Sequence, residues 1–151
     1  MGIIQPCDFF QVNTVTSMAA TNEEVQGSYG RCLREKGFIN RFYELLLAKD
    51  PRIARMFEGT NWTQQNKALR RGISIALTFA GGSSIVERSM NEMAVVHSRK
   101  GKVPVDPSFY VYWRESLIEA VAESDPRFNE DLRRAWNDAL KATTDYFTKS
   151  Y

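Results

Sequence analysis

The chain has 151 residues, of which 43% are hydrophobic and 25% charged, a composition typical of one folded, water-soluble domain. Its 20 basic and 18 acidic residues leave a net charge of +2, too balanced for the clustered basic face of a nucleic-acid-binding protein. No apolar run is long enough to span a membrane, and no basic start precedes a long apolar stretch, so we expect a cytoplasmic protein without a signal peptide. Cys7 and Cys32 are then expected to stay reduced.

The first helix is predicted to follow a short leader. Residues 1–20 show no clear hydrophobic period, and we expect them to be at best partly ordered, with a single domain at residues 21–151. Thr21 and Glu24 have the spacing of a capping box, in which the two side chains satisfy the exposed amides at the start of a helix. Gly37 is predicted to end this helix in a left-handed conformation.

Two further helices are predicted before residue 60. The segment from Phe38 to Ala48 repeats large apolar side chains at intervals of three and four residues, which indicates a broad buried stripe. Asp50 and Pro51 then form a helix start, since a carboxylate caps the free amides and proline suits the first helical position. The short helix that they begin carries Ile53, Met56 and Phe57.

A longer helix is predicted from about Trp62 to Ala80, and the pair Gly81 and Gly82 is predicted to end it. Ser83 or Ser84 can cap the next helix. One face of that helix carries four residues at helical spacing: Val86, Met90, Met93 and His97.

The remaining chain predicts a connection and two long helices. Residues 100–107 contain one glycine and two prolines, and Asp106 with Pro107 repeats the cap-and-proline start of a long helix. Asp125 and Pro126 are predicted to end that helix, and the last helix runs from about residue 129 to residue 146 or beyond. No segment reads convincingly as a strand, so the predicted fold class is all-α.

His97 is the only histidine, and it decides which chemistry is open to the chain. No phosphate-binding glycine loop or zinc cluster is recognisable, and a nucleophile that needs a histidine partner has only His97 available. Considered alone, a histidine on an apolar helical face is more often a hydrogen-bonded core residue than a metal ligand.

The surrounding pattern resembles the bacterial single-domain globins and the haem domain of flavohaemoglobins. Phe42 and Tyr43 are followed by the proline-capped helix that ends at Phe57, in the order and spacing of that family. Gln65 and the Lys, Ala and Leu that end at Leu69 match the start of the family's long helix, and His97 follows Gln65 at the family's distance. The resemblance spans about residues 24–147. It implies a globin fold of six to eight helices around one haem b.

The resemblance also implies roles for individual residues. His97 would ligate the haem iron, and the residues expected to contact the haem are Phe57, Leu69, Met93, Val103 and Tyr110. On the opposite side, Tyr43, Gln65 and Leu69 would face a bound diatomic gas such as oxygen, nitric oxide or carbon monoxide. A hydroxyl and an amide donor in a pocket of low dielectric favour oxygen over carbon monoxide. The alternatives are that Phe57 and Leu69 are ordinary core, that Tyr43 is satisfied elsewhere, and that Gln65 or Gln64 faces solvent.

Two further details of the family pattern stay open. Tyr110 matches a tyrosine near the family's proximal histidine, where it would either tune the histidine or only pack. Flavohaemoglobins complete a relay with a glutamate on the last helix, and no glutamate follows Glu130, which argues against strong peroxidase-like activation. Several cations are candidates for the haem propionates, and none is assigned: Lys67, Arg70, Arg71, Arg99 and Lys100.

Four functions are compatible with these observations. The first is a globin that stores, transports or scavenges oxygen. The second is a nitric oxide dioxygenase, an enzyme that would need a separate reductase because the chain leaves no room for a reductase domain. The third is a gas sensor whose ligand shifts a conformational equilibrium read by a partner. The fourth is a haem-free protein of globin-like fold.

Overall fold

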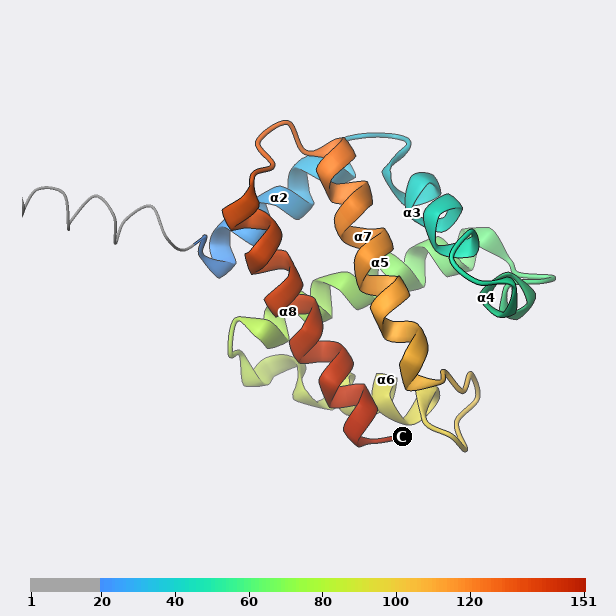
Figure 1. Cartoon of the computed structure of the whole chain (residues 1–151). Helices are drawn as coiled ribbons and strands as arrows, with labels where there is room; N and C mark the ends of the chain where they lie inside the picture. The colour runs from blue at the N-terminus through green and yellow to red at the C-terminus, as the bar shows by residue number, and fades with distance from the viewer. Residues whose placement is uncertain (1–19) are drawn as a thin grey trace, which may run out of the picture.

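The computed structural model describes residues 20–151 and is built from helices (Figure 1). Seven α-helices and two short 3-10 segments occur in this range, and no strand is present among the described residues. The all-α prediction is therefore confirmed. Residues 1–19, which make up nearly all of the expected leader, and Cys7 lie outside the described residues. Between residues 20 and 151, no helix has both the length and the apolar character needed to cross a membrane.

The predicted helix starts are confirmed where they depend on local capping. Helix α2 (Asn22–Leu33) begins with the capping box: Glu24 N donates to Thr21 Oγ1 at 3.2 Å, and Thr21 N donates to Glu24 Oε2 at 3.0 Å. Helix α4 (Pro51–Met56) begins at the predicted proline, with Asp50 as its cap. Helix α5 (Trp62–Ala80) has the predicted bounds.

The prediction for Gly37 is wrong. Helix α2 already ends at Leu33, because the chain tightens into turns in which the next two amides bond to carbonyls three residues back. Gly37 has a φ of −88° and is the residue that precedes helix α3 (Phe38–Leu47). Positive φ values among the described residues occur only at Gly59 and Gly82, and Gly82 belongs to the pair predicted to end α5.

The second half of the chain follows the predicted order with one difference. Ser83 caps a 3-10 segment at residues 84–86, which leads into helix α6 (Glu87–His97). The predicted start at Asp106 and Pro107 opens a 3-10 segment (Pro107–Phe109), and helix α7 (Tyr110–Ser124) begins only after it. Helix α8 (Glu130–Lys149) is the last element.

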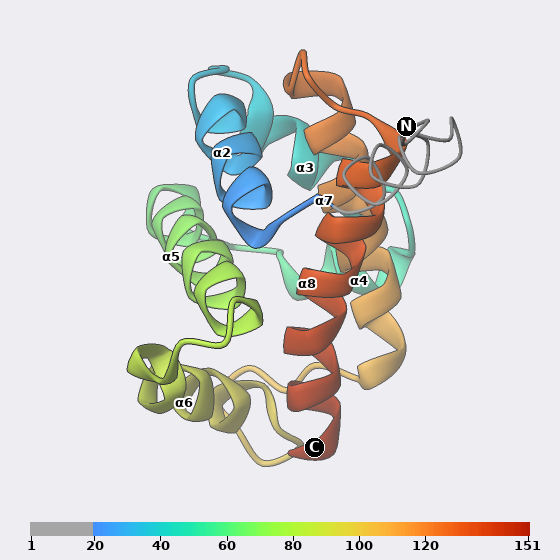
Figure 2. The same ribbon diagram turned by 90° about the vertical axis from the view of Figure 1, so that its left-hand side faces the viewer.

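The helices pack in pairs around one large core. Helix α3 packs on α7 and α5 on α8, while α7 and α8 lie side by side after a short connection (Figure 1). Figure 2 shows α5 and α6 along one side of the molecule, with α6 beside the C-terminal part of α8. A second, smaller apolar cluster lies between α5, α6, α7 and α8, and its members are Ile75, Met90, Ala94, Tyr110 and Phe147.

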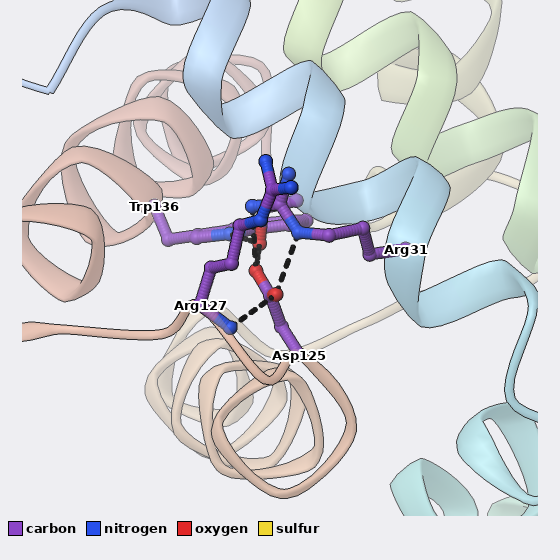
Figure 3. A network of polar contacts seen from close by, with 5 residues as sticks. Arg31, Asp125, Arg127 and Trp136 are labelled. Atoms are coloured by element: carbon purple, nitrogen blue, oxygen red, sulfur yellow. Dashed lines mark hydrogen bonds and ion pairs between the residues drawn. The ribbon is translucent and has the colours of Figure 1, made fainter.

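A buried carboxylate, that of Asp125, links α2, α7 and α8 (Figure 3). We call Asp125 and its hydrogen-bonding partners the Asp125 network. The side chain of Asp125 is fully buried and accepts two hydrogen bonds from Arg31, at 2.7 and 2.9 Å, and one from Ser28 at 2.6 Å. Arg127 N donates a fourth at 2.9 Å, and Trp136 Nε1 donates to Ser28 Oγ at 3.0 Å. Burial alone would raise the pKa of Asp125, but these donors outweigh it and lower the pKa to about 2.

Candidate functional site

A cavity of about 850 Å³ lies between helices α5, α6, α7 and α8, and residues of α3 and α4 also contribute to its lining. Its volume is within the range of sites that hold cofactors and drug-sized ligands. Most of its wall is apolar, with large side chains contributed by each of these helices, including Leu69, Ile75, Met93, Trp113 and Phe147. Such a wall suits a flat, largely apolar ligand, and the few polar side chains on it set which chemistry is available.

His97, the last residue of α6, lies on the wall of this cavity. Its Nδ1 lies 3.2 Å from the carbonyl oxygen of Val103, and its ring packs against Phe147 with centroids 5.6 Å apart. A carbonyl can only accept, so this hydrogen bond places a proton on Nδ1, and in the neutral ring the lone pair is then on Nε2. A neutral imidazole oriented through Nδ1 is the usual form of a histidine that ligates a metal.

The loop that supplies this carbonyl depends on Gly101, a residue that sequence analysis did not single out. A Cβ atom on Gly101 would lie 2.2 Å from the carbonyl oxygens of both Val95 and Val96, closer than any real contact. Only glycine lets the chain turn this tightly against the end of α6 and return Val103 to His97. The glycine in the predicted connection was visible in the sequence, but its close approach to another backbone was not.

Helix α5 supplies Gln65 and Leu69, one turn apart, to the cavity wall. Gln65 Nε2 donates a hydrogen bond to the hydroxyl oxygen of Tyr43, from α3, at 3.2 Å. Tyr43 is buried and is not itself among the residues that line the cavity. Burial raises the pKa of Tyr43, and the hydrogen bond from Gln65 partly opposes this rise. The two predicted distal donors therefore form a pair in which Gln65 lies between Tyr43 and the cavity.

The structure brings the other predicted site residues together around the same cavity. In addition to His97, five residues were expected to contact a haem. All five line the cavity: Phe57, Leu69, Met93, Val103 and Tyr110. Gln64, the alternative to Gln65, also lines the cavity, but Gln65 is the one that pairs with Tyr43. Their contacts with a haem remain predictions.

Tyr110 packs against Phe147, the residue that also contacts His97. The ring centroids of Tyr110 and Phe147 lie 5.9 Å apart. Burial, and to a lesser degree Tyr151, raises the pKa of Tyr110 to about 12. Among residues 20–151 the hydrogen-bonding partner of the imidazole is the Val103 carbonyl, which favours a packing role for Tyr110.

Of the five candidate cations for haem propionates, Arg71 is the one that lines the cavity, and it is exposed at the cavity edge. The guanidinium of Arg99 lies over the ring of Tyr151, 4.9 Å from its centroid. The other three candidates, Lys67, Arg70 and Lys100, are exposed and absent from the lining residues.

Two residues near the cavity were missed in the sequence. Thr143 lies on the wall, is 1% exposed, and has a hydroxyl that finds no hydrogen-bonding partner among the described residues. Trp62 packs behind the wall, against Tyr43 and Phe57. Its position three residues before Gln65 was the available signal, because that spacing places both on neighbouring parts of one helix face.

Comparison with known proteins decides the family. No protein-family model and no curated protein sequence matches the chain. Among solved structures, the chain is similar to the protein PA3967 of Pseudomonas aeruginosa PAO1, which is described as structurally highly homologous to a human haemoglobin. The two are 32% identical with a TM-score of 0.82, over 86% of this chain and 97% of that protein. The chain is a globin.

The predicted globin fold is thus confirmed, and the match supports the bacterial single-domain part of the resemblance. The likeness to flavohaemoglobins stays a prediction. In this globin, α5 and α6 both contribute to the cavity wall, where helices of the globin fold enclose a haem pocket.

Proposed function

We propose that this globin binds haem b through His97 and reversibly binds oxygen beside Gln65 and Tyr43. The observation that carries the proposal is one largely apolar cavity whose wall includes both an imidazole oriented through its Nδ1 and an amide paired with a buried phenol. The donor set fits the cofactor, since a neutral imidazole is the usual proximal ligand of globins. When bound, haem supplies an iron with one open coordination position for a diatomic gas.

The proximal side is arranged for binding rather than for strong activation. Val103 holds the imidazole of His97 through a backbone carbonyl, which carries no net charge. A carboxylate at that place would draw the Nδ1 proton and make the ring more electron-donating. With a neutral acceptor the imidazole remains an ordinary neutral ligand, which suits reversible gas binding.

The distal pair supplies hydrogen-bond donors to a polarised ligand. One amide hydrogen of Gln65 is used by Tyr43, which orients the amide, and the second remains for a molecule in the cavity. The apolar side chains of Phe57 and Leu69 on the cavity wall lower the local dielectric, so such a hydrogen bond would be stronger than in bulk solvent. Arg71 lines the cavity and is exposed, which supports it as the candidate partner of a propionate.

Absorption spectra of the purified protein in ferric, ferrous and oxygenated forms test the proposal. We expect a Soret band that is lost in His97→Gly and recovered when imidazole is added, because the free base replaces the missing side chain. A colourless protein after haem addition, or an unchanged spectrum in His97→Gly, would refute haem binding through His97.

Oxygen dissociation kinetics test the distal pair. Gln65→Leu and Tyr43→Phe should release oxygen about tenfold faster, since a hydrogen bond is worth up to roughly 1.5 kcal/mol. Tyr112→Phe is the control, because this partly buried tyrosine of α7 is not among the cavity residues. Rapid nitrate formation from nitric oxide with an added reductase would instead make the chain a nitric oxide dioxygenase.

A further inference from the structure

Trp62 connects the protein surface with the wall of the cavity. Its side chain is 41% exposed, so one part of the indole meets solvent. The ring stacks on Phe57, with centroids 5.8 Å apart and an interplanar angle of 8°, and packs against Tyr43 at 5.0 Å. Phe57 lines the cavity, and Tyr43 reaches it through Gln65. Aromatic rings thus form an unbroken contact from solvent to the candidate haem site.

The other two tryptophans do not share this position. Trp136 is fully buried and donates its indole hydrogen to Ser28. Trp113 lines the cavity and is partly buried. Packing on Phe57 does not by itself require an indole, because any apolar side chain gains from covering apolar surface. Indole differs from an aliphatic side chain in giving up an electron readily, and Trp62 is placed where that property has a use.

We propose that Trp62 transfers electrons from the surface into the cavity after the haem-loaded globin has reacted with hydrogen peroxide. The electrons come from a small phenol or enediol reductant, which is oxidised at the surface. The proposal rests on the proposed binding of haem. It requires no strong peroxidase-like activation, because it concerns where the electrons come from once peroxide has reacted. Hydrogen peroxide is the two-electron oxidant, and two molecules of reductant each supply one electron and one proton, so that two waters and two reductant radicals result.

The contacts assign each group a part in this transfer. Trp62 gives an electron through the rings of Phe57 and Tyr43 and releases its indole proton to the solvent that it touches. Tyr43 is buried, and its hydroxyl oxygen accepts from Gln65, so it acts as a contact that keeps its own proton. A reductant at the surface then returns an electron and a proton to the indole.

Peptide mass spectrometry after peroxide treatment of the haem-loaded protein tests the proposal without measuring turnover. Without reductant, oxygen should be added mainly at Trp62 rather than at Trp113, and ascorbate should suppress this addition. Protein loaded with zinc protoporphyrin is the control, because it fills the cavity but does not react with peroxide in this way. Oxidation of Trp62 caused only by its exposure would be equal in the two forms.

A substitution at Trp62 distinguishes loss of electron transfer from loss of folding. Trp62→Phe keeps an aromatic ring on Phe57 and should bleach several-fold faster under peroxide, with slower ascorbate consumption and an unchanged circular dichroism spectrum. Equal Trp62 oxidation in the iron and zinc forms, or unchanged bleaching in Trp62→Phe, would overturn the inference alone. A wild-type preparation that takes up no haem would refute the proposed function and this inference with it.

Discussion

Replacing Asp125 with asparagine removes the charge at the centre of the Asp125 network while keeping the shape of the side chain. The pKa of this carboxyl is lowered from 3.8 to about 2. Each pKa unit corresponds to about 1.4 kcal/mol, so the folded state gains about 2 kcal/mol from the charged form at neutral pH. Asp125→Asn should lower the free energy of unfolding by about this amount.

The pH dependence of this loss comes from the direction of the shift. Because the folded-state pKa lies below the ordinary value, the contribution is complete above about pH 5 and disappears as the pH falls toward 2. Urea unfolding followed by circular dichroism should therefore show the gap between wild type and Asp125→Asn narrowing by about 1 kcal/mol between about pH 7 and about pH 3.

The pair between Arg41 and Glu123 supplies the matched control. It also joins an arginine to a carboxylate by two hydrogen bonds across distant segments, at 2.7 and 3.1 Å, but both side chains are about two-fifths exposed. Glu123→Gln should have a much smaller effect, because water and salt screen exposed pairs. If the two variants lost equal stability, or if the Asp125→Asn gap did not change with pH, the buried hydrogen bonds from Arg31, Ser28 and Arg127 would not stabilise the charged carboxylate as the lowered pKa implies.

Three other predictions test local features, the first of them with a control substitution. Gly82→Ala should lower the thermal midpoint, because φ is +85° there, whereas Gly37→Ala, at φ −88° with open space around its Cβ position, should not; equal effects would contradict this assignment. Gly101→Ala should displace the loop that orients His97 and weaken haem retention, measured by haem transfer to apomyoglobin; wild-type retention would show that the loop tolerates a side chain. Tyr110→Phe should leave the iron–histidine stretching frequency unchanged, and a shift would reveal proximal tuning.

Features set by neighbouring residues could be predicted from the sequence. The capping box at Thr21 and Glu24 and the start at Asp50 and Pro51 require only atoms within one turn, so their spacing was sufficient. The prediction for Gly37 failed because the end of a helix also depends on how the next segment packs in space. The chain turned earlier, through residues in the right-handed conformation. No particular residue type is needed for such a turn, so the sequence does not show where it occurs.

Some features of the candidate site could likewise be predicted from the sequence, and others could not. His97 and Gln65 were placed because helical periodicity and the family spacing both point to them, and both line one cavity. The partner of His97 is a backbone carbonyl, which every residue carries, so no residue type marks it. Asp125 was interpreted as a helix stop beside Pro126, and its bonds to residues of α2 could not be seen because they join segments far apart in the sequence.

The acceptor for His97 has a consequence for how this globin tolerates change. A side-chain partner can be deleted by one substitution, but a carbonyl of the main chain survives every replacement at Val103, including a change to another size or polarity. The orientation of the imidazole is therefore robust to sequence drift in the loop. The position at which substitution would disturb this orientation is Gly101, because a Cβ atom there would force the backbone to move.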